Sequence, residues 1–173
     1  MNKQILAAFT LLLFALAITG YAYSHWQETV QIQGTAQIAK LEIIIQDYQT
    51  TLDSQISQDN HTLNLTGTIT PSQSLLTNIT IKNNGTTPAT ITHTITTNNT
   101  DLWNTYFTYS QNLTEPYELP AENIVTVLQN ITLTDDQLEP FTIEVTVTYT
   151  ATFQSWTDTI TINYTLTYQK GES

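Results

Sequence analysis

The chain has 173 residues, enough for one domain or two small ones, and contains no cysteine, so disulfides and cysteine metal sites are excluded. Its formal net charge is −11, from 4 lysines against 15 acidic residues, which excludes the basic face that nucleic acid or anionic lipid would bind. Charged residues make up only 11% of the chain, whereas 36 threonines and a hydrophobic content of 40% favour an ordered, β-rich protein.

Residues 1–22 have the features of a signal peptide. Lys3 precedes an apolar run over residues 5–18, and small residues just before Tyr23 give the spacing of a cleavage site. We expect cleavage between Ala22 and Tyr23, so that the chain meets the membrane only during export. The run is also close to the minimum length of a membrane-spanning helix. An uncleaved anchor is therefore the second interpretation, and a retained helix of the type IV pilin kind is the third.

Residues 23–36 are predicted to be a short strand followed by a break. Apolar and polar side chains alternate over Glu28–Gln33, which gives the strand one partly apolar face. The residues of that face are Trp26, Glu28, Val30 and Ile32. Gly34 then begins a flexible break of small residues. The rest of the chain, 37–173, is expected to form one domain.

This domain is predicted to be all-β, because its hydrophobic pattern has a period of two. The clearest strands are Thr90–Thr96, Phe141–Phe153 and Thr159–Tyr168, and the weaker ones are Ala39–Gln46, Leu63–Ile69, Leu76–Lys82, Leu102–Tyr109 and Ile124–Leu133. No convincing amphipathic helix is predicted in it, and Asp47–Gln58 is the one stretch that could hold a short helix. Thr70–Ser72 is a break, and Asn83–Gly85 is a turn of the kind that joins hairpin strands. Short strands separated by turns predict a β-sandwich of jelly-roll type.

Eight Asn-x-Thr sequons are candidate glycosylation sites, at Asn60, Asn64, Asn78, Asn84, Asn98, Asn112, Asn130 and Asn163. Because asparagine and threonine are both abundant, several of these matches arise by chance. None is forced into the core by its position in the alternating pattern. Asn84 and Asn112 are the best candidates, because they fall in predicted turns.

No pattern of catalytic residues is present. The histidines His25, His61 and His93 lie far apart in the sequence, and no nucleophile or phosphate-binding motif occurs. Asp135, Asp136 and Glu139 have the chemistry to bind calcium, although an acidic turn is more often simply solvated. We therefore expect neither an enzyme nor a cofactor.

Two stretches resemble the TasA/camelysin family of biofilm-matrix proteins. The first is Tyr23–Ala36 followed by Lys40–Ile43, and the second is Asn64–Leu75 followed by Ile79–Thr86. Ser72 stands where the family usually has glycine. The archaeal bundling pilins share this plan, and the threonine-rich, arginine-free, sequon-rich composition of this chain is closer to them.

The resemblance implies a secreted jelly roll that polymerises by donor-strand complementation. In that arrangement Trp26, Glu28, Val30 and Ile32 enter a sheet of the next subunit, with Gly34 as the hinge. The partners would be identical subunits in a homopolymeric cell-surface filament, and neighbouring filaments in bundles. The residues alone equally allow the segment to be the first strand of its own sheet.

Two other functions compete with this one. The first is a monomeric, membrane-anchored β-sandwich that acts as an adhesin or binds glycans at the cell surface. The second is an enzyme, because some camelysin relatives have been called metalloproteases. The lack of clustered His, Asp and Glu residues in the sequence speaks against the enzyme.

Overall fold

The computed structural model describes residues 3–25, 39–135 and 139–170. The chain divides into two units, residues 1–37 and 38–173. The first contains helix α1 (Lys3–His25), which continues past the predicted cleavage position. Among the described residues, no helix combines the length and the hydropathy needed to cross a membrane. The predicted donor strand and its hinge at Gly34 lie outside the described residues.

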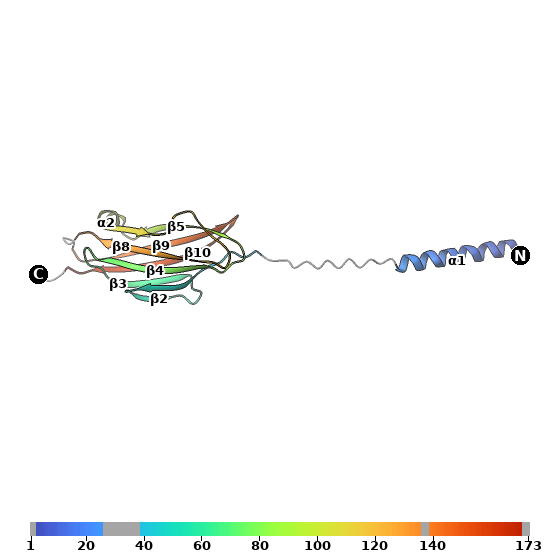
Figure 1. Cartoon of the computed structure of the whole chain (residues 1–173), viewed down its shortest axis with the longest axis horizontal. Coiled ribbons are helices and arrows are strands. Elements are labelled where there is room, and N and C mark those ends of the chain that lie inside the picture. Colours follow the sequence, from blue (N-terminus) through green and yellow to red (C-terminus); the bar gives the residue numbers. More distant parts are fainter. Residues whose placement is uncertain (1–2, 26–38, 136–138, 171–173) are drawn as a thin grey trace. The chain divides into compact units, whose positions relative to one another are not determined.

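The second unit is an all-β sandwich of two sheets, as predicted, with strands that run roughly along its long axis (Figure 1). The four-stranded sheet has the order β1-β4-β8-β6 and the six-stranded sheet the order β2-β3-β10-β9-β5-β7. The strands are β1 (Ile43–Thr50), β2 (Asp53–Ile56), β3 (Thr62–Thr68), β4 (Ser74–Asn83), β5 (Ala89–Thr97), β6 (Phe107–Gln111), β7 (Tyr117–Leu119), β8 (Ile124–Leu133), β9 (Phe141–Phe153) and β10 (Trp156–Tyr168). A short helix, α2 (Thr100–Tyr106), precedes β6.

Successive strands mostly alternate between the two sheets, and β9 and β10 form a long hairpin, joined by Gln154 and Ser155. β3 pairs with β10 in parallel, with Asn64 opposite Asn163, whereas the other named strand pairs of the described residues are antiparallel. The parallel pair joins segments about one hundred residues apart in the chain. It therefore ties the C-terminal strand to the first strands of the domain.

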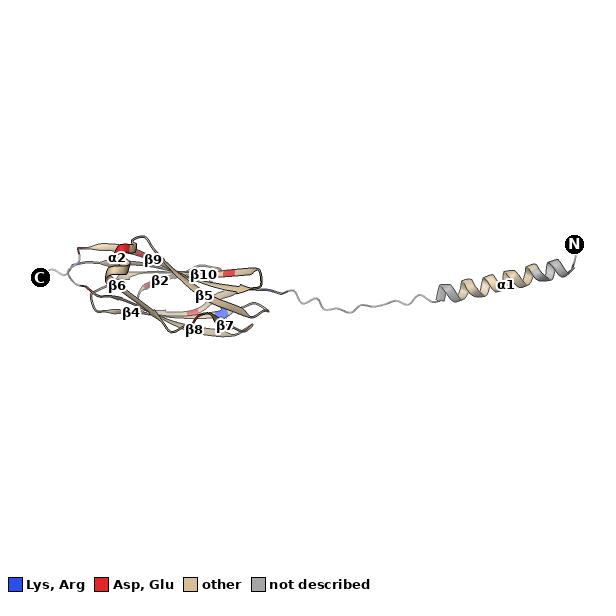
Figure 2. Cartoon of the chain, turned by 90° about the horizontal axis from the view of Figure 1, so that it is seen from above, with Lys and Arg blue, Asp and Glu red and all other residues tan. Residues whose placement is uncertain are grey.

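The core lies between the sheets and is filled by the inward residues of each alternating strand. Its largest fully buried side chains are Tyr149, Tyr164, Ile43, Ile45, Leu63, Leu65, Ile69, Ile79, Ile81, Ile91, Leu119 and Ile131. The outward residues are mainly threonine and asparagine, and charged positions are few and scattered over the domain (Figure 2). Threonine suits this position because its branched side chain favours a strand while its hydroxyl stays solvated.

A polar network crosses this core between the sheets. Gln129, fully buried on β8, accepts a hydrogen bond from the Tyr164 hydroxyl and donates one to the Tyr149 hydroxyl at 2.8 Å. The Tyr149 hydroxyl in turn donates to Gln111 Oε1 at 2.7 Å. Within the described residues, every buried side-chain nitrogen and oxygen has a hydrogen-bond partner. The network is thus fully satisfied, as a polar group in a protein core must be.

The predicted strands over Ile124–Leu133 and Phe141–Phe153 are confirmed with the same bounds. The strand predicted over Leu102–Tyr109 is wrong in its first half, which is helix α2. The Asn99 side chain caps this helix by accepting a hydrogen bond from the Leu102 amide at 3.0 Å, and Asp101 lies in its first turn.

Two further expectations from the sequence are wrong. The short helix considered for Asp47–Gln58 is instead the end of β1, a turn and strand β2, which pairs with β3. The turn at Asn83–Gly85 does not join a hairpin, because β4 and β5 belong to different sheets. Asn83, which is buried, lies where the chain passes from one sheet to the other.

Candidate assembly site

The chain enters the sandwich through a clamp, formed by Lys40–Glu42 and the turn residues Asn83–Thr87. The Asn84 amide donates to Glu42 O at 2.8 Å, and the Thr86 amide donates to Lys40 O at 2.9 Å. The Thr86 hydroxyl accepts from the Lys40 amide at 2.9 Å, and the Thr87 hydroxyl donates to Lys40 O at 3.1 Å. Hydrogen bonds at Lys40 and Glu42 therefore hold the three residues before β1 against the turn.

Asn83 and Gly85 shape the turn side of this clamp. The buried Asn83 amide nitrogen donates to Thr87 O at 2.8 Å and to Leu119 O at 3.1 Å, while its side-chain oxygen accepts from the Gly85 amide at 3.0 Å. A Cβ atom on Gly85 would lie 2.3 Å from Lys40 O. Glycine is needed here for the close approach of two backbones rather than for an unusual backbone angle.

Side chains reinforce the clamp. Lys40 Nζ lies 2.6 Å from Glu42 Oε2, and the side-chain nitrogen Nδ2 of Asn84 donates to the same carboxylate. The hydrogen bond from Lys40, helped by the one from Asn84, holds the pKa of Glu42 below its ordinary value. One residue further on, the Ile43 amide donates to Asp158 Oδ2 at 2.8 Å, which joins the start of β1 to the β9–β10 hairpin.

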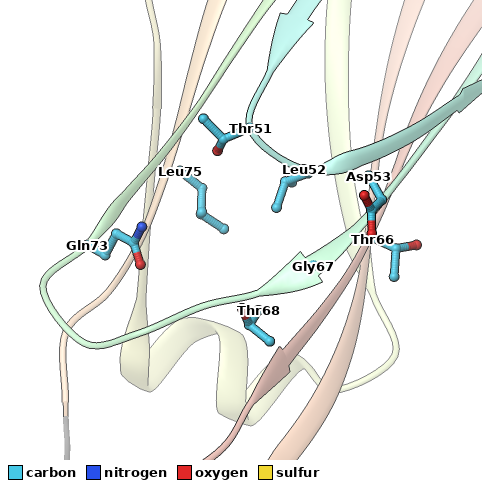
Figure 3. A pocket seen from close by; sticks show the side chains of 8 residues that line it. All are labelled: Thr51, Leu52, Asp53, Thr66, Gly67, Thr68, Gln73 and Leu75. Carbon is cyan, nitrogen blue, oxygen red and sulfur yellow. The ribbon is translucent and has the colours of Figure 1, made fainter.

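An open sheet edge lies next to a hollow of about 330 Å³ at the β1–β2 turn. β2 pairs with β3 only as far as Thr66, so that Gly67 and Thr68 have no strand partner on that side within the described residues. Figure 3 shows Leu52 and Leu75 in the middle of the hollow, between Gln73 and the strand that carries Gly67. The remaining lining residues are Thr51, Asp53, Thr66 and Thr68. The exposed lining of the hollow is mainly polar, since Leu75 is buried, so the unpaired backbone groups are the feature that an added strand would bind.

The sequons occupy different surroundings. Asn78 and Asn130 lie on the outer face of the four-stranded sheet, and Asn64 and Asn163 on that of the six-stranded sheet. The Asn163 amide nitrogen donates to Asn64 Oδ1 at 2.9 Å, so these two form one cross-strand pair.

The remaining sequons lie in turns or at element ends. Asn84, expected to be exposed, is half-buried against Glu42. Asn112 is exposed, but its side chain accepts from the Leu128 amide at 2.8 Å. Asn98 accepts from the backbone of β9, and Asn60 sits in a turn with a positive φ of 59°.

His61 and His93 each lie beside acidic side chains, and His61 Nδ1 is 3.9 Å from Asp59 Oδ2. His61 Nε2 lies 3.5 Å from Asp158 Oδ2. His93 Nδ1 contacts Glu115 and lies 3.0 Å from the amide nitrogen of Gln111, at the surface end of the core network. In the part of the chain that the structure describes, no three His, Asp or Glu side chains are placed to hold a metal ion.

Sequence reasoning missed Gln129 and Asp158. The position of Gln129 does carry a signal, because its parity on β8 is that of the apolar residues Val127 and Ile131. A polar residue at an inward position indicates a buried hydrogen-bond network. Asp158 gave no such signal, since its partner Ile43 is 115 residues away in the chain.

No protein-family model matches the sequence, and no curated protein matches it. Among solved structures, the fold is similar to part of a family 123 glycoside hydrolase from Clostridium perfringens, with a TM-score of 0.48 and 11% identity over 75% of this chain and 28% of that one. It is also similar to part of the secreted serine protease VesC from Vibrio cholerae, with a TM-score of 0.41 and 10% identity over 67% of this chain and 23% of that one. The chain therefore spans about a quarter of the length of each, and likeness at this level leaves its function open.

Proposed function

We propose that this protein is a secreted structural subunit of an extracellular filament, a bundling pilus or biofilm-matrix fibre. Subunits join head to tail when the segment Trp26–Gln33 of one enters a sheet of the next. Such a contact uses two different surfaces, so it propagates into a filament instead of closing a dimer. The observation that carries the proposal is the open edge at Gly67 and Thr68, next to the hollow at the β1–β2 turn.

The jelly-roll description of the sandwich belongs to this proposal. Strands that alternate between two facing sheets are typical of jelly rolls. The parallel pairing of β3 with β10 is a departure from the purely antiparallel form. It leaves β3 near one edge of its sheet, covered only by the four residues of β2.

The clamp supports the proposal from the donor side. A strand that leaves its own domain transmits every pull along the filament to the point where it joins that domain. At this point Lys40 and Glu42 are tied by backbone hydrogen bonds to the turn at Asn84–Thr87.

The energetics of strand donation depend on apolar burial. Burying Val30 and Ile32 against apolar side chains of the next subunit contributes about 1.5–3 kcal/mol each, and Trp26 contributes at least as much. Each ladder hydrogen bond adds about 0.5–1.5 kcal/mol. Ordering the segment costs about 1–2 kcal/mol per residue, so the apolar face decides whether the contact forms.

The apolar face therefore provides the test. The double variant Val30→Asp/Ile32→Asp should be secreted and folded but should not polymerise, because two unpaired charges would have to enter the groove. The matched control is Thr29→Asp/Gln31→Asp, which adds the same charge to the opposite face of the same segment. The control should still form filaments under the electron microscope.

A second variant separates donation from simple misfolding. Deleting Tyr23–Gln33 should leave a soluble monomer whose melting temperature rises when a synthetic Tyr23–Gln33 peptide is added, by linkage. If the segment is instead the first strand of its own sheet, the deletion should unfold or aggregate the domain. Equal loss of filaments in both double variants would also contradict strand donation, since charge alone would then explain the loss.

A further inference from the structure

The outer face of the four-stranded sheet carries two exposed leucines, each beside a sequon asparagine. Leu76 of β4 is directly opposite Asn130 of β8, and Asn78 of β4 is directly opposite Leu128. The two leucines are 50% and 37% exposed. In an antiparallel pair such opposite side chains are about 5 Å apart, and next-but-one neighbours on a strand about 7 Å. Each asparagine therefore has both leucines within reach of anything attached to its amide.

The leucines lie among uncharged polar residues. Gln49 is opposite Asn78 on β1, and Ser110 is opposite Asn130 on β6. A shallow hollow of about 270 Å³ opens here, and it is lined by Leu76, Leu128, Asn130, Ser110, Gln111 and Asn112. The hollow joins the two leucines to the Asn130 amide and offers space for a bulky polar group.

Both sequons present the acceptor amide and the sequon hydroxyl on the same face. Because side chains alternate along a strand, Asn78 and Thr80 point outward together, as do Asn130 and Thr132. The Thr132 hydroxyl donates to Asn130 Oδ1 at 3.5 Å, and no hydrogen bond of the Asn78 side chain is found within the described residues. Neither amide nitrogen is needed to hold the fold.

Two other sequons differ in this respect. The Asn163 side-chain nitrogen donates to Asn64 Oδ1 at 2.9 Å, and the Asn163 side-chain oxygen accepts from the Thr146 hydroxyl at 3.0 Å. The Asn112 amide nitrogen donates to Thr126 O at 3.3 Å while its oxygen accepts from Leu128, so it completes the edge of β8. A sugar on either amide would compete with hydrogen bonds that the fold already uses.

We propose that Asn78 and Asn130 carry N-linked glycans and that these glycans cover Leu76 and Leu128. This inference rests on one part of the proposed function, the export of the chain, because N-linked glycans are transferred during export. The glycans keep the outer face of the four-stranded sheet wet, so that it does not pack on the same face of another subunit. An exposed apolar pair in a threonine-rich sheet would otherwise favour such packing.

The modification is a substitution at the anomeric carbon of a lipid-phosphate-linked oligosaccharide. The Nδ2–C1 bond forms and the bond from C1 to the phosphate oxygen breaks. The lipid phosphate leaves with the bonding electrons, and Nδ2 gives up one of its two protons to a base of the transferase. No oxidation or reduction takes place.

The test begins with glycopeptide mass spectrometry of the full chain purified from the cells that secrete it. Most copies should carry sugar at Asn78 and at Asn130, and few at Asn163 or Asn112. Asn78→Gln and Thr80→Val should each remove the same single glycan, and Asn130→Gln and Thr132→Val the other. An unmodified amide at Asn78 or Asn130 overturns the glycan proposal even if filaments form. A glycosylated protein that never polymerises supports the glycan proposal and refutes the proposed function.

The covering of the leucines has its own readout. Asn78→Gln/Asn130→Gln should bind a fluorescent hydrophobic dye several-fold more strongly than the glycosylated protein. Adding Leu76→Thr/Leu128→Thr should return the signal to its original level, with Asn163→Gln as the control that leaves dye binding unchanged. Dye binding that does not rise when both glycans are lost, in a protein with an unchanged melting temperature, overturns the covering.

Discussion

The substitution Gly85→Ala should loosen the clamp that holds the start of the domain. The new Cβ atom would lie 2.3 Å from Lys40 O and 3.0 Å from the Glu42 amide, whereas ordinary contact begins at 3.4 Å. The two backbone segments must therefore move apart by about 1 Å, because the close neighbours Lys40 O and the Glu42 amide are backbone atoms and no flexible side chain can give way. Lys40 O accepts hydrogen bonds from Thr86 and Thr87, and such a shift breaks or weakens both.

The magnitude follows from these contacts. Overpacking costs about 1–3 kcal/mol and each of the two hydrogen bonds about 0.5–1.5 kcal/mol, so we expect a loss of about 2–6 kcal/mol. For a domain of this size that corresponds to a fall in melting temperature of about 8–24 °C. Thermal unfolding followed by circular dichroism measures it directly.

Gly67→Ala is the matched control. Its Cβ atom would lie 2.5 Å from Leu52 Cδ2, but this atom is the tip of a flexible side chain that borders the hollow. Leu52 can therefore rotate away, and the cost should stay below about 1 kcal/mol. Equal stability losses in the two variants would refute the reasoning that backbone contact, rather than added volume, sets the cost at Gly85.

Three other predictions concern the core network and pH. Gln129→Leu should lower the free energy of unfolding by about 2–4 kcal/mol, seen as a lower urea midpoint with an unchanged slope, because the Tyr149 and Tyr164 hydroxyls each lose a buried partner. Burial raises the pKa of Tyr149 to about 12 and raises that of Tyr164, so ionisation favours the unfolded chain and stability should fall as pH rises above about 10. Tyrosinate absorbance should then appear together with unfolding, and early ionisation in the folded protein would contradict this. The pKa of Glu42 is lowered below 4.5, so its contribution is present above that pH and is lost as pH falls below it; Glu42→Gln should flatten the acid side of the melting-temperature profile.

The strands could be predicted because their residues alternate over long, uninterrupted runs. β9 has inward apolar and outward polar residues at nearly every position, so periodicity fixes both the element and its buried face; on β8 the inward Gln129 and the outward Leu128 are exceptions to the same alternation. Helix α2 was missed because its apolar residues are few. Leu102, Trp103 and Tyr106 do have helical spacing, and Asn99 is a typical N-cap, so a local signal was present.

The assembly site could be predicted only in part. The turn at Asn83–Gly85 is visible in the sequence, but its contact with Lys40 joins residues 46 positions apart and depends on which strands are neighbours. The open edge beyond Thr66 likewise depends on the short pairing of β2 with β3. Sequence patterns specify faces well and strand order poorly, because strand order is decided by packing across the whole domain.

Electron microscopy of the protein secreted by its own cells tests the central claim most directly. The account predicts filaments whose mass fingerprint is that of this chain alone, and whose subunits release from one another only when the domain itself unfolds. A folded protein that stays monomeric at every concentration, salt and temperature tried would contradict it.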